Sequence, residues 1–211
     1  MKNHGLGKEA ARMNRMEVVF GDAEIRSALR SRLHIEHGGD ADTVIMEELG
    51  FCRGQVRIDL AVVNGFLHGY EIKSDRDSLR RLGVQIDYFS KVLDRATLVA
   101  GERHIEKTID MVPGWWEILR VETGLVGPQF RIVQQGSGNP NRDPRLLVEL
   151  IWLDDAVELL EQRGAARGVR GKPRRVVWDR VCECFELEEI AKTVRDHLKA
   201  RSAPQGPAPL L

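Results

Sequence analysis

The chain has 211 residues, 42% hydrophobic and 30% charged, and its 32 basic and 32 acidic residues leave no formal net charge. This composition predicts a soluble globular protein with one main domain. It argues against a protein that coats DNA by charge alone, because nonspecific affinity for DNA comes mainly from phosphate neutralisation. No apolar run reaches membrane-spanning length, and three cysteines without a Cys-x-x-Cys pair favour a reducing, cytoplasmic location.

The first half of the chain alternates helical and strand patterns. Residues 1–16 are polar and predict a flexible arm. A helix follows over residues 21–33, because Ile25, Leu29 and Leu33 recur at helical spacing. Three strands, a second helix and a fourth strand are then predicted at residues 43–49, 56–63, 66–73, 75–89 and 96–100. The element order αβββαβ indicates an α/β fold.

The second and third strands form a hairpin around Asn64-Gly65, the strongest short hairpin signal in the chain. A two-residue loop that pairs Val63 with Phe66 would set Asp59 opposite Tyr70. A three-residue loop, or one bulge, would set Asp59 opposite Glu71 instead. We predict the second register.

That register creates a candidate metal site. Two carboxylates a few ångströms apart repel by ~4 kcal/mol at an effective dielectric near 20, unless a cation lies between them. Oxygen ligands with room for water suit Mg²⁺ or Mn²⁺. Lys73 follows Glu71 by two residues, so it projects to the same side of the strand and could hold a water nucleophile or neutralise phosphate charge. The alternative is an ordinary solvated face of the hairpin.

Asp59, followed by Glu71-Ile72-Lys73 on the next strand and then by a helix, resembles the PD-(D/E)xK nuclease superfamily. Further segments resemble a small bacterial and phage family within it: Arg57-Ile-Asp-Leu-Ala-Val-Val-Asn-Gly, Gly69-Tyr-Glu-Ile-Lys-Ser-Asp, Arg80-Arg-Leu, Gln85 and Tyr88. The superfamily's proline is absent, since Ile58 precedes Asp59. The resemblance implies a restriction-endonuclease-like αβββαβ core with a mixed central sheet over residues 17–135.

The resemblance also assigns roles to site residues. It implies that Asp59, Glu71 and the Ile72 carbonyl bind the metal, that Lys73 is the catalytic lysine and that Gln85 approaches the substrate or the attacking water. Many members of the superfamily add an acid from the first helix. Glu24 is our choice for it, although an acid in a first helical turn also complements the helix dipole, and Asp22 could be the N-cap. Glu47 and Glu48 are the alternatives.

Two groups of basic residues are candidates for contacts with nucleic acid. Arg76, Arg80 and Arg81 fall at the start of the predicted helix after the hairpin and could bind phosphate. A glycine-rich basic loop without acids lies between residues 163 and 175 and holds further candidates: Arg167, Arg170, Lys172, Arg174 and Arg175. In both groups the alternative is simple solvation of charged side chains.

The second half of the chain extends the sheet and then becomes helical. A helix at residues 104–111 and strands at 116–122 and 129–133 are predicted. Residues 136–144 are rich in turn formers and predict a linker. A small helical subdomain over 145–201 and a disordered tail over 202–211 complete the chain.

These features predict a Mg²⁺- or Mn²⁺-dependent nuclease that cleaves DNA with a metal-activated water. Two alternatives stay open: a binding module of the same fold that does not cleave nucleic acid, and a partner-binding accessory protein of a mobile element. The sequence also leaves homodimerisation open.

Overall fold

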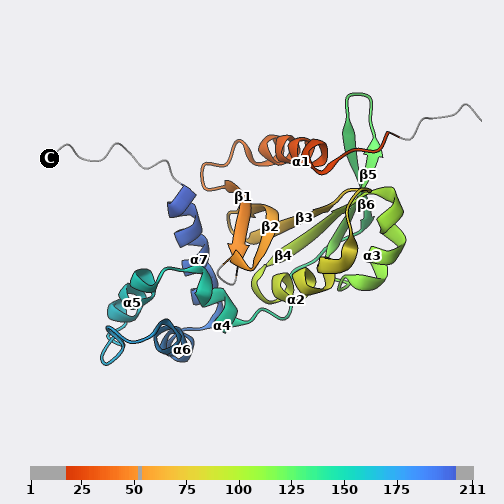
Figure 1. The fold of residues 1–211 in the computed structure, drawn as a ribbon. Coiled ribbons are helices and arrows are strands. Elements are labelled where there is room, and N and C mark those ends of the chain that lie inside the picture. Colours follow the sequence, from red (N-terminus) through yellow and green to blue (C-terminus); the bar gives the residue numbers. More distant parts are fainter. Residues whose placement is uncertain (1–17, 52–53, 203–211) are drawn as a thin grey trace, which may run out of the picture.

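Six strands form one mixed sheet in the order in which they occur along the chain (Figure 1). The computed structural model describes residues 18–51 and 54–202. The strands are β1 (Val44–Phe51), β2 (Val56–Val63), β3 (Leu67–Lys73), β4 (Arg95–Ala100), β5 (Glu117–Thr123) and β6 (Pro128–Gln134). The first three are antiparallel, β3, β4 and β5 are parallel, and β6 returns antiparallel to β5. The predicted α/β class and mixed sheet are confirmed.

The two parallel steps need crossover connections, and helices supply them. Helix α2 (Leu82–Val92) joins β3 to β4, and η3 (Glu102–His104) with α3 (Ile105–Met111) joins β4 to β5. Helix α1 (Asp22–His37) precedes the sheet, so the chain runs α1-β1-β2-β3-α2-β4, the order that the sequence predicted.

The second helix begins later than predicted. Ser74 donates its backbone N–H and its hydroxyl to Asp77 Oδ2, which closes a turn instead of starting a helix. Ser78 then caps the short 3₁₀ segment η2 (Leu79–Arg81), and α2 starts only at Leu82. Neither Ser74 nor Asp75 caps α2, and Arg76 lies in the turn before it.

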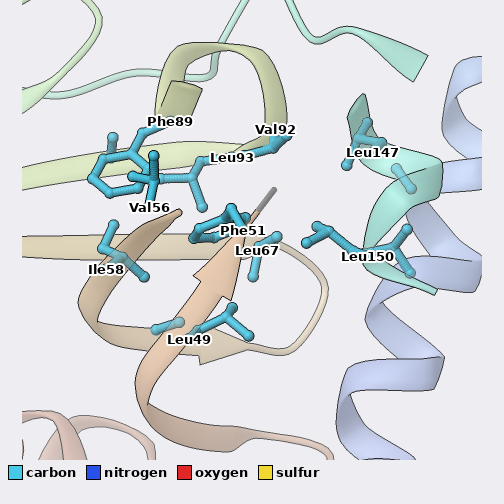
Figure 2. Close-up of a cluster of buried hydrophobic side chains, with 14 of the residues drawn as sticks. Leu49, Phe51, Val56, Ile58, Leu67, Phe89, Val92, Leu93, Leu147 and Leu150 are labelled. Atoms are coloured by element: carbon cyan, nitrogen blue, oxygen red, sulfur yellow. The ribbon is translucent and has the colours of Figure 1, made fainter. Parts of the chain in front are cut away.

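The two faces of the sheet carry separate hydrophobic clusters. On one face, Ile25, Leu29 and Leu33 of α1 pack against Leu60 and Val62 of β2. The opposite face packs against α2 and against the carboxyl-terminal helices. Figure 2 labels ten members of this second cluster, among them Leu49 and Phe51 of β1 and Leu147 and Leu150 of the helical segment. The helices after the linker therefore share a core with the sheet.

The helical segment consists of α4 (Pro144–Leu147), η4 (Val148–Leu150), α5 (Leu153–Gln162), α6 (Arg174–Cys184) and α7 (Leu187–Ser202). Residues 135–143, which contain most of the predicted linker, hold no helix or strand but are tied to the sheet domain: Asn139 donates to the carbonyls of Ser90 and Leu93 at 2.7 and 2.8 Å. Helix α7 runs one residue into the predicted tail. The arm at 1–16, the rest of the tail and Cys52 lie outside the described residues. Within 18–51 and 54–202, no helix has the length and apolar character needed to cross a membrane.

Candidate active site

The hairpin closes through a three-residue loop. Val63 pairs with Leu67 and Leu60 with Tyr70, so the loop consists of Asn64, Gly65 and Phe66. The predicted three-residue loop is confirmed, and the register of the paired residues, extended by one position, sets Asp59 opposite Glu71. The ladder itself ends at Leu60, and beyond it Asp59 Oδ2 accepts a hydrogen bond from the Ile72 backbone N–H at 2.7 Å. This bond holds the aspartate against the backbone between Glu71 and Lys73.

The strand that carries Asp59 is irregular at this position. Ile58 belongs to the cluster on the α2 side of the sheet and Leu60 to the cluster on the α1 side, although two residues apart on a regular strand share a face. On β1, the residue facing this point is Glu48, whose φ of 53° lies in the left-handed region. A non-glycine residue in such a conformation costs about 1–3 kcal/mol, and such residues are concentrated at functional sites.

Glu71 is the buried centre of the site, with 2% of its surface exposed. Its Oε1 accepts hydrogen bonds from Lys73 Nζ and, at 2.5 Å, from Gln85 Nε2. Among the described residues, neither Glu71 Oε2 nor Gln85 Oε1 has a hydrogen-bond partner, although both atoms are buried. Burial, followed by the charge of Asp59, raises the pKa of Glu71 to about 7, against the opposing effects of Lys73 and Gln85. The glutamate is therefore held where an additional positive charge would stabilise its ionised form.

Arg26 of α1 occupies the other side of the site, and sequence reasoning missed it. Its guanidinium donates to Asp59 Oδ1 at 2.6 Å, to Glu48 Oε1 at 2.7 Å and to Asp22 Oδ2 at 3.2 Å. It also reaches the Asp59 carbonyl at 3.2 Å. Burial lowers the pKa of Arg26, but Asp59, Asp22 and Glu48 outweigh burial and raise it above the ordinary value. Burial raises the pKa of Asp59, although the hydrogen bond from the Ile72 amide and the charge of Arg26 act to lower it.

One cavity of about 430 Å³ joins these groups. Asp59, Glu71, Lys73 and Gln85 all line it, as does Ile72. The sequence-predicted catalytic residues are thus brought together. In the described part of the chain, however, no three His, Cys, Asp or Glu side chains form a ready metal-binding group. Arg26 already pairs with three of the carboxylates.

The acid chosen on the first helix lies elsewhere. Glu24 Oε2 accepts the backbone N–H of Gly21 at 2.8 Å, and Gly21, not Asp22, is the N-cap of α1. Glu24 does not line the cavity, and Glu47 pairs with Arg30 and lines a different cavity. Asp22 and Glu48 do line the site. Of the three predicted acids Glu24, Glu47 and Glu48, Glu48 alone lines this cavity, together with Asp22.

A family model described as bacteriophage P4 protein cII matches residues 16–206. The chain belongs to the bacteriophage P4 protein cII family. Protein cII of Enterobacteria phage P4 is 26% identical to it over 149 residues, which cover 71% of this chain and 56% of the phage protein. The chain thus spans little more than half the length of this curated relative. Membership of a phage protein family agrees with the sequence analysis, and the placement of this family within the PD-(D/E)xK superfamily stays a prediction.

Two solved structures also resemble this member of the P4 cII family. SPO1766, a protein of unknown function from Silicibacter pomeroyi, is 19% identical and aligns over 71% of this chain and 92% of its own, with a TM-score of 0.39. SfsA of Pyrococcus furiosus, solved in complex with Ca²⁺, is 13% identical and aligns over 57% of this chain and 67% of its own, with a TM-score of 0.34. These scores are too low to support inferences from either structure.

The two groups of basic residues predicted to contact nucleic acid lie in different parts of this P4 cII family member. Arg81 lines the active-site cavity, whereas Arg76 and Arg80 do not, and the guanidinium of Arg76 donates to the Val19 carbonyl. The basic loop does not line the active-site cavity either. Several of its arginines pair with acids of the helical segment, namely Arg163 with Glu189, Arg170 with Glu161 and Arg175 with Asp179. Arg167 and Lys172 are exposed. Arg174 lines a separate cavity, which it shares with Trp178.

Signals for Asp22, Arg26 and Glu48 were weak in the sequence. Asp22 and Arg26 are four residues apart on a helix, a spacing that brings their side chains together. Their approach to Asp59 depends on how α1 packs on the sheet, which the spacing does not specify. Glu48 was considered as an acid, but its left-handed backbone is not visible in the sequence.

Proposed function

We propose that the chain is a metal-dependent nuclease of the PD-(D/E)xK superfamily that hydrolyses phosphodiester bonds in DNA. The observation that carries the proposal is the convergence of Asp59, Glu71, Lys73 and Gln85 in one cavity. Two acids and a lysine on paired strands suit metal-assisted phosphodiester hydrolysis. The order α1-β1-β2-β3-α2-β4 and the mixed sheet agree with a restriction-endonuclease-like core.

The residues present fit a divalent cation. Glu71 Oε2 is buried without a partner among the described residues, and an unpaired buried carboxylate oxygen is costly. Asp59, Glu71 and the Ile72 carbonyl would hold Mg²⁺ or Mn²⁺, ions that prefer oxygen ligands. Asp22 and Glu48 share the Arg26 guanidinium with Asp59 and line the same cavity.

Lys73, Gln85 and Arg81 would have separate roles beside the metal. A bound divalent cation would supply an activated water and charge stabilisation at the phosphate. Lys73 Nζ, held at Glu71 Oε1, is placed to orient the attacking water or to neutralise charge that develops on the phosphate. Gln85 fixes the Glu71 carboxylate through the second bond to the same oxygen. Arg81, on the cavity wall, is available for a neighbouring phosphate.

Incubation of the purified protein with single-stranded, duplex and branched DNA in Mg²⁺ or Mn²⁺ tests the proposal. We expect cleavage by the wild type and its loss in Lys73→Ala. Lys91→Ala is the matched control, because Lys91 is exposed at the end of α2 and does not line the site. Intact DNA under all conditions, or cleavage by Lys73→Ala at the wild-type rate, would contradict the proposal.

A second candidate is a DNA-binding module of the same fold that does not cut. The pairing of Arg26 with Asp59 favours it, because the chain itself neutralises one proposed ligand. Thermal unfolding with and without Mn²⁺ separates the two. A resident metal site should stabilise the nuclease by about 2.7 kcal/mol at a hundredfold excess over Kd, whereas the module should show no shift and bind DNA equally well after Lys73→Ala.

A further inference from the structure

A second cavity adjoins the active site. It has a volume of about 170 Å³ and is lined by residues from the end of β1 and from the helices α5, α6 and α7. Gly54, in the β1–β2 connection, lines both this cavity and the active-site cavity, so the two cavities are neighbours. A ligand that extends from the proposed catalytic groups past Gly54 therefore reaches the helical segment.

The walls of this second cavity combine two tryptophans and two arginines with one acid, Glu149, which pairs with Arg145. Trp152 is 58% exposed, and Arg201 Cζ lies 5.3 Å from the centre of its ring. Trp178 is only 4% exposed, yet its Nε1 has no hydrogen-bond partner among the described residues. Buried indole N–H groups usually find an acceptor. The cavity thus offers an exposed indole, which Arg201 and His197 contact, and a donor without an acceptor among the described residues.

The two arginines of the cavity differ from most arginines around them. Arg163, Arg170, Arg175 and Arg180 each pair with an acid. Within the described residues, Arg174 and Arg201 form no ion pair with any acid, and both are exposed. Arg174 is also the first residue of α6, where a cation opposes the helix dipole and an anion would be favoured. The charge of Arg174 does not stabilise the helix at this position, but it could bind a phosphate there.

The contents of the cavity follow from its size and chemistry. It has room for one base and is too small for a base pair. Stacking on an aromatic ring is the common way in which proteins hold unpaired bases, and arginines hold the flanking phosphates. The leucine side chains of Leu49, Leu150 and Leu198 add an apolar floor. Duplex DNA, whose bases are already stacked and paired, could not use these groups.

We propose that this cavity is a subsite for one unpaired nucleotide of the DNA strand that enters the active site. Trp152 stacks on the base, and Arg174 and Arg201 contact the adjoining phosphates. The helical segment thereby selects substrates with a single-stranded part. The inference rests on the proposed function for the identity of the strand, but binding at the subsite requires no cleavage and is measured without metal.

The test uses the full chain in EDTA and a fluorescein-labelled single-stranded oligonucleotide, with binding followed by anisotropy. Trp152→Ala should weaken binding roughly 5- to 100-fold, the range for loss of one stacked base, and Trp152→Phe should restore most of it. Phe66→Ala is the control. Phe66 is 47% exposed and lies under Arg95 as Trp152 lies under Arg201, but it sits in the β2–β3 loop away from the cavity.

Arg174→Ala and Arg180→Ala form a second matched pair, because Arg180 lies on the same helix and pairs with Glu183. Only Arg174→Ala should reduce the slope of log affinity against log salt, by about 0.7 for one lost phosphate contact on single-stranded DNA. Affinity for the same sequence as a blunt duplex should not change with Trp152→Ala. Wild-type affinity of Trp152→Ala for the single strand, or no binding of single strand by the wild type, overturns the subsite.

The outcomes also separate the subsite from the proposed function. Trp152-dependent binding without any cleavage leaves the subsite in place and removes the nuclease. If cleavage depends on Lys73 but Trp152→Ala binds single strand with wild-type affinity, the nuclease stands and the subsite is ruled out.

Discussion

The guanidinium of Arg26 lies 2.6 Å from the carboxylate of Asp59. A carboxylate proposed to bind metal is therefore already paired with a cation of the protein. The same guanidinium contacts Asp22 and Glu48. One monovalent cation thus neutralises part of a group of three acids. A divalent ion that binds Asp59 must share this carboxylate with Arg26 or displace it, and metal affinity should be low until Arg26 moves.

Arg26→Ala should therefore bind Mn²⁺ more tightly than the wild type, while its metal-free form is less stable. Removal of one partner from a largely buried ion pair leaves carboxylates uncompensated, which costs roughly 3 kcal/mol. Isothermal titration with Mn²⁺ and urea unfolding with and without metal measure both effects. Arg30→Ala is the control, because Arg30 lies one turn further along α1 in an exposed pair with Glu47, worth about 0–1 kcal/mol. Equal Mn²⁺ affinity in Arg26→Ala and the wild type would contradict the competition.

The hairpin was predictable because two signals agree. Alternation of apolar residues marks the two strands, and Asn64-Gly65 marks the turn between them. These local rules leave two registers open, and the three-residue loop was chosen because it brings Asp59 to Glu71. Gln85 was found through the resemblance to a nuclease superfamily, and its bond to Glu71 agrees with that choice.

The residues that sequence reasoning missed depend on tertiary geometry. Arg26 reaches Asp59 because α1 packs across β2, and Glu48 turns to the site through a single left-handed residue. The start of α2 was misplaced because the Ser74–Asp77 hydrogen bonds compete with helix formation over the same residues. The basic loop has a sequence typical of phosphate contacts, but three of its six basic residues pair with acids of the helical segment.

The left-handed backbone at Glu48 predicts a difference in stability between a glycine and an alanine variant, which measures the conformational strain there. At φ 53°, glycine avoids the clash of a Cβ, so Glu48→Gly should be more stable than Glu48→Ala by about 1 kcal/mol. Both variants lose the same contacts with Arg26 and Arg57, which therefore cancel in the comparison. The neighbouring pair Glu47→Gly and Glu47→Ala should show the opposite order, because glycine destabilises a regular strand by about 0.5–1 kcal/mol. Urea unfolding of the four variants decides it, and an alanine variant that equals or exceeds glycine at position 48 would exclude strain there.

His68 predicts how stability depends on pH. Its ring lies between the Thr97 hydroxyl, 2.8 Å from Nε2, and the Tyr70 hydroxyl, 3.2 Å from Nδ1. Thr97 donates to Glu117, so it accepts from Nε2–H and leaves Nδ1 to accept from Tyr70. Burial, and then the charge of Arg95, lowers the pKa of His68 to about 3. The folded protein thus keeps this imidazole neutral.

The unfolded chain binds a proton at His68 below about pH 6.5, whereas the folded protein does not, so this contribution to stability is complete above pH 6.5 and is lost as the pH falls toward 3. Each pH unit in that window should cost up to about 1.4 kcal/mol. Urea unfolding at pH 7.5, 6 and 5 should give a shallower decline for His68→Gln than for the wild type. His34→Gln, at an exposed histidine of α1, should decline as the wild type does. Parallel curves for His68→Gln and the wild type would mean that His68 takes up a proton in the folded protein.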